Sequence, residues 1–294
     1  MKLKFSYKLF PVFFMIMYFN HPENLSAQEG NDVKEVSAPK FFIGISGGPS
    51  FCHEIFTPTT SISGLTSADK NTYSASIDLG YFFSKHLGLI TGVGYSVFSS
   101  DLSLNDYTNT FTTKDADNES YQKQITGSGV KETQTITYFK IPVELCFRFR
   151  PGKRFGFYIF GGADVLFPVN GDYNGSGTFT YIGYYPAYNV TFQNLPAYGF
   201  TSNTPVSTSG SLTLKSNSFE GIAGGGLSCF ITSKIQVSLN GYYARSLSTI
   251  SGYGSSDTYQ LTSDPNSINS LMGANREVTA QTIGAKLAFR YYIK

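Results

Sequence analysis

Charged residues, histidine and tryptophan are scarce in this chain of 294 residues. Asp, Glu, Lys and Arg make up 14% of the chain, against about 25% in typical soluble domains. The net charge of +2 provides no basic excess, so no nucleic-acid partner is predicted. There is no tryptophan, and the three histidines are scattered along the chain. This composition is unusual for a soluble domain.

Cysteine is also scarce. Cys52, Cys146 and Cys229 are odd in number and widely spaced, and no CxxC pair occurs. This pattern excludes a disulfide framework and gives no metal-ligand spacing. Each cysteine falls within an expected strand, so we interpret all three as small apolar residues that pack in the protein interior.

Long apolar runs are missing beyond residue 28, so the mature chain has no predicted transmembrane helix. A basic start followed by an apolar run over 9–19 predicts a signal peptide over 1–28. The alternative is a retained membrane anchor, but the run is short and contains a proline. The polar segment 29–40 is interpreted as a periplasmic lead-in, and 41–294 as the folded β domain.

Aromatic residues and glycine are abundant, with 21 Tyr, 26 Phe and 30 Gly. In the segment 134–150, apolar side chains at odd positions alternate with Lys140, Glu144 and Arg148. A helix would mix these two faces, whereas a strand separates them. Similar alternation, weaker in the first and sixth segments, predicts eight strands, at 41–52, 73–84, 88–104, 134–150, 155–169, 216–231, 235–250 and 276–294.

The links between these segments alternate in length. Those after the second, fourth and sixth are short (85–87, 151–154, 232–234), and the others are long (53–72, 105–133, 170–215, 251–275). This layout is typical of outer-membrane barrels. It predicts an all-β fold, an eight-stranded antiparallel up-and-down transmembrane β-barrel with short periplasmic turns and long extracellular loops. A lipocalin-like soluble barrel shares this topology but would expose unbroken apolar stripes to water.

Two strands carry recognisable motifs. Residues 138–145, which read YFKIPVEL, resemble the Tyr-x-x-Ile/Val-Pro strand of the PorT-like outer membrane protein beta-barrel family of Bacteroidetes. Residues 282–289 are similar to the C-terminal strand signal that the barrel assembly machinery reads, although this chain continues to Lys294. The resemblance implies an outer-membrane location and a barrel fold, and it raises a role in protein export, but it implies no single activity.

Eight charged side chains alternate with the apolar stripes and are expected inside the barrel: Asp78, Lys140, Glu144, Arg148, Asp164, Glu220, Lys286 and Arg290. Eight strands enclose a space that side chains fill, so we predict that these charges pair as a structural network. The alternative is a proton or ion path. A three-residue turn after Arg150 would place Lys140 opposite Asp164, whereas a five-residue turn would place it opposite Leu166. Pro142 has no N–H, which predicts a local irregularity.

No catalytic, cofactor or metal site is predicted. Of the three histidines, His21 leaves with the signal peptide and His86 lies in a short turn. His53 begins the first long link, where only Asp106 or Asp172 could complete an acid–base pair at the rim. No serine, histidine and acid are grouped recognisably, which makes a rim enzyme the weakest hypothesis.

The link 170–215 is rich in aromatic residues and poor in charge. Tyr173, Tyr181, Tyr184, Tyr185 and Tyr188 lie among Ser, Gly and Asn, a mixture typical of adaptable contact surfaces. One interpretation is a surface that contacts an extracellular glycan or protein. The other is that these residues extend the neighbouring strands and add to an aromatic girdle.

Three hypotheses about function follow. The first is a non-catalytic outer-membrane barrel with a structural or surface-interaction role, the second is an accessory factor in protein export, and the third is a rim-located enzyme. The expected partners are outer-membrane lipid, the barrel assembly machinery during biogenesis and an extracellular ligand.

Overall fold

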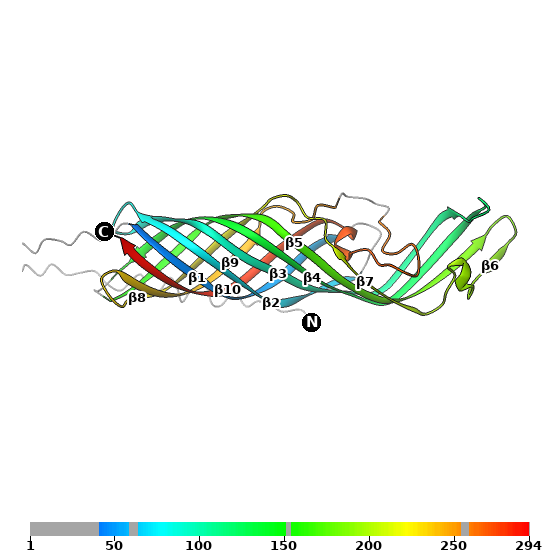
Figure 1. Ribbon diagram of the computed structural model, residues 1–294, viewed down its shortest axis with the longest axis horizontal. Coiled ribbons are helices and arrows are strands. Elements are labelled where there is room, and N and C mark those ends of the chain that lie inside the picture. The colour runs from blue at the N-terminus through cyan, green and yellow to red at the C-terminus, as the bar shows by residue number, and fades with distance from the viewer. Residues whose placement is uncertain (1–40, 59–63, 151–153, 254–258, 294) are drawn as a thin grey trace, which may run out of the picture. The chain divides into compact units, whose positions relative to one another are not determined.

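Eight antiparallel strands of the chain form a closed ring (Figure 1). The computed structural model describes residues 41–58, 64–150, 154–253 and 259–293, so the predicted signal peptide and lead-in lie outside the described residues. β1 pairs with β2 and β10, and pairing of β4 with β5 completes the ring. The ring strands are β1 (Phe41–Pro58), β2 (Leu65–Phe82), β3 (Leu87–Lys114), β4 (Ser120–Phe149), β5 (Phe155–Tyr185), β8 (Ser218–Phe230), β9 (Ile235–Ser246) and β10 (Asn275–Ile293). The predicted antiparallel eight-strand ring is thus confirmed.

The outer wall of the ring carries a continuous band of large exposed apolar side chains, here called the apolar belt. Leu145 is 56% exposed and Leu239 is 63% exposed, while the alternate positions of the same strands are buried. The belt covers 41–51, 73–83, 87–97, 139–149, 155–169, 219–231, 235–243 and 283–293. Beyond it, the same wall carries polar and charged residues, including His53, Asn71, Asp101, Thr135, Arg245 and Gln281.

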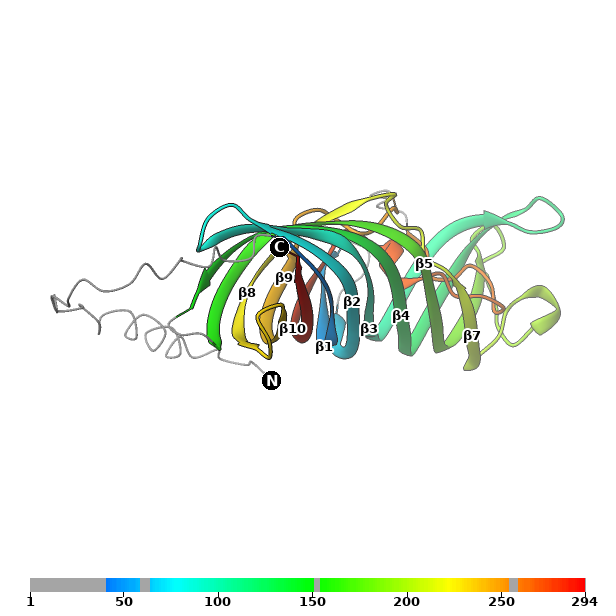
Figure 2. The ribbon, with the colours of Figure 1, turned by 60° about the vertical axis from the view of Figure 1, so that its left-hand side comes forward.

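At one end of the ring, the strands continue beyond the belt as the outer extension, defined as 98–138 and 170–214 (Figures 1 and 2). β3 and β4 form one hairpin that turns at 115–119, and β5 also pairs with β6 (Val190–Phe192) and β7 (Thr204–Ser211). The predicted loop over 105–133 is therefore wrong, because it consists mostly of paired strand. For 170–215, the strand-extension interpretation holds over 170–185.

Two bulges exchange the inner and outer faces of strands in the outer extension. Tyr138 pairs with Pro168 and Thr137 with Asn170, which leaves Val169 as an extra residue on β5. A second irregularity on β4 lies at Gly129, whose φ of 59° is in the left-handed region that favours glycine. Each extra residue reverses the alternation, so odd-numbered side chains face outward in the belt and inward beyond the bulge.

The pairing of β4 with β5 differs by two residues from the main prediction. Phe149 lies opposite Phe157, and Lys140 therefore lies opposite Leu166, the alternative attached to a longer turn. Between β3 and β4, Thr91 pairs with Val143 and Gly94 with Lys140, but the residues between them, including Pro142, are unpaired on that side. The expected irregularity at Pro142 is confirmed, since proline has no N–H for the ladder.

The cysteines and the short links can be compared with their predictions. All three cysteines are free thiols, as predicted. Cys52 and Cys146 are buried, but Cys229 is half-buried on the outward-facing side of β8, opposite the exposed Phe155, so its predicted place in the interior is wrong. The links at 83–86, 150–154 and 231–234 are short, although 151–153 lie outside the described residues. In the described part of the chain, no helix is long and apolar enough to cross a membrane.

Candidate functional site

The structure places all eight predicted interior charges on the inner face of the ring, with seven of them buried and Lys286 half-buried. Lys140 Nζ lies 2.8 Å from Asp164 Oδ2, and Lys286 Nζ lies 3.5 Å from Glu144 Oε1. The Lys140–Asp164 pair forms on the diagonal, because the two residues are not directly opposite each other. Glu220 lies directly opposite Asp164 on β8.

The interior arginines pack against aromatic rings. The Arg148 guanidinium carbon lies 3.6 Å from the centre of the Phe82 ring. Arg290 lies 4.9 Å from the Phe42 ring centre and donates a hydrogen bond to the Tyr158 hydroxyl at 3.2 Å. Cation–π contacts of this kind hold a buried guanidinium without a carboxylate partner. Ion pairs and ring contacts together fill the interior at the level of the belt.

Two further buried acids, Glu54 and Glu132, were not predicted, because both fall in segments that the sequence analysis assigned to long links. Glu132 accepts hydrogen bonds from the Ser270 hydroxyl at 2.8 Å and the Leu271 backbone N–H at 2.7 Å. These contacts fix the segment 259–274, which includes the short helix η4 (Leu271–Ala274), inside the outer extension. Burial raises the pKa of Glu132 above its ordinary value.

His53 does not meet Asp106 or Asp172, the predicted rim partners. Its Nδ1 lies 2.6 Å from Asp69 Oδ1 on the neighbouring strand, and both side chains are substantially exposed. No group of three or more His, Cys, Asp or Glu among the described residues has the geometry of a metal site. His53 and Asp69 therefore form an exposed pair at the edge of the belt.

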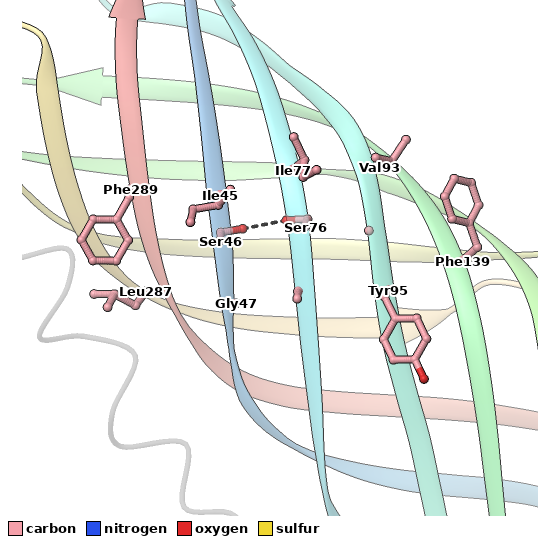
Figure 3. Close-up of a pocket in the computed structure, with 12 residues that line it drawn as sticks. Ile45, Ser46, Gly47, Ser76, Ile77, Val93, Tyr95, Phe139, Leu287 and Phe289 are labelled. Atoms are coloured by element: carbon pink, nitrogen blue, oxygen red, sulfur yellow. Dashed lines mark hydrogen bonds between the residues drawn. The ribbon is translucent and has the colours of Figure 1, made fainter.

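A hollow of about 630 Å³ lies on the outer wall, within the belt (Figure 3). It opens where the small residues Gly47, Ala75 and Gly94 leave a gap among Ile45, Ile77, Val93, Phe139, Leu287 and Phe289. Ser46 and Ser76 in its lining are hydrogen-bonded to each other at 2.7 Å. The hollow suits a hydrocarbon chain and supplies little polar chemistry to orient a ligand.

A second pocket, of about 640 Å³, lies at the tip of the outer extension and is here called the tip pocket. Its lining comes mainly from the β3–β4 turn and from the segment that runs from β6 through η3 (Pro196–Tyr198). Figure 1 shows β6 at the far end of the outer extension. Its lining residues are Asp115, Ala116, Asp117, Glu119, Tyr121, Tyr185, Tyr188, Phe192, Leu195, Ala197, Tyr198 and Phe200. Aromatic rings and carboxylates therefore share one cavity.

The five tyrosines predicted as surface contacts differ in their exposure. Tyr173, Tyr181 and Tyr185 are buried, so their prediction as surface contacts is wrong, because the bulge at Val169 turns odd-numbered positions of β5 inward. Tyr184 is half-buried. Tyr188 is 60% exposed and lines the tip pocket.

Sequence reasoning missed most of the tip pocket. Tyr121, Asp115 and Glu119 fall in the predicted link 105–133. Nothing in the sequence of this link indicates that it lies next to residues 188–200. Only the hairpin turn itself had a local signal, the run Asp-Ala-Asp-Asn at 115–118, since Asp and Asn are frequent in turns.

Comparison with solved structures finds similar proteins at low identity. Ail, the attachment invasion locus protein of Yersinia pestis, is 13% identical, with 86% of this chain and 99% of that chain covered and a TM-score of 0.31. The outer membrane protein OprG of Pseudomonas aeruginosa is 11% identical (87% and 98% covered, TM-score 0.36). The outer membrane protease OmpT of Escherichia coli is 9% identical (87% and 98% covered, TM-score 0.34). These values say nothing about what this chain binds or does.

No curated protein matches the sequence. The family model described as "Outer membrane protein beta-barrel domain" matches residues 27–252, well over half of the chain. The match covers the predicted barrel as far as the link after β9. The chain therefore belongs to the outer membrane protein beta-barrel domain family.

Proposed function

We propose that this chain is a non-catalytic barrel that crosses the outer membrane through its apolar belt and presents the outer extension at the cell surface as a contact surface. The observation that carries this proposal is the belt itself. On β1 it runs from 41 to 51, which at ~3.4 Å per residue and a tilt of about 40° covers roughly 28 Å along the barrel axis. That height matches the apolar band of about 25 Å in outer-membrane barrels.

The two ends of the ring differ, which supports one orientation. The short links and the paired strand ends Phe41 and Ile293 share one end. The outer extension occupies the other end. Outer-membrane barrels place short turns in the periplasm and long connections outside. The outer extension is therefore assigned to the cell surface, and the predicted signal peptide over 1–28 would direct export.

The interior charges, the surroundings of His53 and the tip pocket together favour a contact role over catalysis or transport. Six of the eight predicted interior charges are ion-paired or packed on rings, as described for Lys140 with Asp164 and Arg148 with Phe82. His53 pairs with Asp69 at an exposed position. The tip pocket, in contrast, holds exposed aromatic side chains such as Tyr198, which is 75% exposed. Exposed aromatic groups at the end of a rigid scaffold are typical of recognition surfaces.

A role in protein export stays a prediction from the PorT-like strand motif, since no contact described above bears on it. Comparing the secreted and surface proteins of cells with and without the gene tests that role. Loss of specific exported proteins would favour an accessory export factor, whereas an unchanged set would leave the contact role.

Membrane fractionation tests the proposed location. The mature chain should be recovered with outer membranes and should migrate faster on SDS gels when it is not boiled, because a closed barrel has no free strand edge and resists detergent. Recovery in the soluble periplasmic fraction, with no heat-dependent change in migration, would contradict the proposal.

A further inference from the structure

The tip pocket has a rigid aromatic floor. The rings of Tyr121 and Tyr185 are stacked, with centroids 5.0 Å apart and planes 11° apart. Phe200 meets the Tyr121 ring edge-on at 5.7 Å, and Phe192 meets the Tyr185 ring edge-on at 5.4 Å. Tyr121, Tyr185 and Phe200 form a buried cluster of their own. A floor built from rings that hold one another does not need to be ordered when a ligand binds.

The wall facing this floor is acidic and comes from the β3–β4 turn. Asp115 accepts hydrogen bonds from the backbone N–H groups of Asp117 and Glu119, at 3.0 and 2.9 Å, and from the Tyr185 hydroxyl at 2.9 Å. Glu119 accepts a hydrogen bond from the Tyr188 hydroxyl at 2.6 Å. Asp115 is thus held in place by the turn and by Tyr185 of the floor, and Glu119 is held by Tyr188.

The charge of this wall is not neutralised locally. The nearby cation, Lys114, donates to the Asn118 side-chain oxygen at 2.9 Å rather than to a carboxylate. Among the described residues, the Asp117 side chain makes no ion pair or hydrogen bond. The N–H of Glu119 and the Tyr185 hydroxyl hold the pKa of Asp115 below its usual range, so this carboxylate is ionised at neutral pH. Desolvation, followed by the same contact with Asp115, raises the pKa of Tyr185 to about 12.

We infer that the tip pocket binds the cationic head group of a small organic molecule, of the alkylammonium class. This inference rests on the proposed surface location and names the ligand chemistry of that surface. Aromatic faces attract cations through the ring quadrupole, and three carboxylates add charge complementarity. An anionic ligand would be repelled by the same carboxylates. A volume of about 640 Å³ lies within the range of small-molecule sites.

Choline and its neutral isostere 3,3-dimethyl-1-butanol provide the test, with the full mature chain folded in detergent micelles. The two probes have nearly the same shape and differ in charge. Binding is measured by ligand-observed NMR or calorimetry at low and high salt. Choline should bind and the isostere should not, and added salt should weaken the binding of choline because exposed charges are screened.

Three variants locate the site. Asp117→Asn and Tyr198→Ala should each weaken choline binding about two- to fivefold, the size expected for one exposed charge or ring. Asp106→Asn is the matched control, since it removes a carboxylate from the same hairpin at an exposed position outside the pocket lining. It should leave binding unchanged. Heat-dependent gel migration confirms that every variant is folded.

Equal binding of choline and its isostere would overturn the inference, as would binding of a neutral sugar or a lysine-rich peptide with no binding of choline. An equal loss in Asp106→Asn and Asp117→Asn would also overturn it. The outcome is independent of membrane fractionation. A chain recovered with outer membranes that does not bind choline refutes this inference alone, whereas a chain that binds choline but is soluble refutes the proposed location alone.

Discussion

Replacing Asp164 with asparagine would leave Lys140 as an uncompensated charge inside the belt. At 2.8 Å and an effective dielectric constant of about 20, the Coulomb attraction between these two groups is about 6 kcal/mol. Removing one partner of a buried pair typically costs about 3–5 kcal/mol, because desolvation has already offset part of that attraction. Glu220, which lies on β8, also attracts Lys140. The expected loss of unfolding free energy is therefore at the lower end of this range, about 3 kcal/mol.

The assay is urea unfolding of the chain in lipid vesicles, followed by the folded fraction on unboiled gels. Adding Lys140→Met to Asp164→Asn should recover most of the lost free energy, since no buried charge is then left alone. Glu220→Gln is the matched control. It should change stability by less than about 1 kcal/mol, because the repulsion from Asp164 that it removes offsets the attraction to Lys140 that it loses. If Asp164→Asn is as stable as the parent, or if Lys140→Met adds to its loss, the ion-pair reasoning is refuted.

Three other changes test other parts of the structure. Leu145→Arg should cost about 2–4 kcal/mol of folding free energy in vesicles, whereas Thr135→Arg, on the same face beyond the belt, should cost about 0–1 kcal/mol. Equal costs would contradict the proposal that the belt contacts lipid. Glu132→Ala removes the acceptor of two hydrogen bonds to segment 259–274, which limited proteolysis should then cut faster, and unchanged cutting would show that the segment is held by other contacts. The stabilisation that Asp115 gives the tip turn is complete above its ordinary pKa of about 4 and is lost as the pH falls through its lowered pKa. The backbone N–H signals of Asp117 and Glu119, which donate to Asp115, should therefore move through the lowered pKa of Asp115 in the parent, and this step should be missing in Asp115→Asn.

The alternation of side chains predicted the belt strands well, because a period of two with one apolar face fixes which side of a strand faces outward. In 134–150 the face containing Leu145 and the face containing Glu144 are as expected. The sequence also indicated the short links, since few residues separate the apolar stripes there.

The alternation of side chains could not predict which residues of the outer extension face inward, and the cause is physical. A single extra residue, Val169 on β5, reverses the alternation, and nothing in its local sequence distinguishes it from its neighbours. The sequence therefore does not show which tyrosines beyond Val169 face inward, and the structure places Tyr173 and Tyr181 in the interior. The tip pocket joins the turn at 115–119 to residues about 70 positions later, and such long-range pairing depends on tertiary contacts.

The register of the β4–β5 hairpin shows the same limit. Parity allowed Lys140 to lie opposite Asp164 or opposite Leu166, and only turn length separates these alternatives. The ion pair forms in the observed register because a lysine side chain is long enough to reach a diagonal neighbour.

Site-specific labelling on intact cells tests the central claim, that the ring crosses the outer membrane with the outer extension outside. Ala116→Cys places a thiol on the exposed β3–β4 turn, and Ser233→Cys places one in the short link at the opposite end of the ring. A membrane-impermeant maleimide should label Ala116→Cys on intact cells and Ser233→Cys only after the outer membrane is permeabilised. Labelling of Ser233→Cys on intact cells while Ala116→Cys stays protected would contradict the orientation, and equal labelling of both only after permeabilisation would contradict the crossing itself.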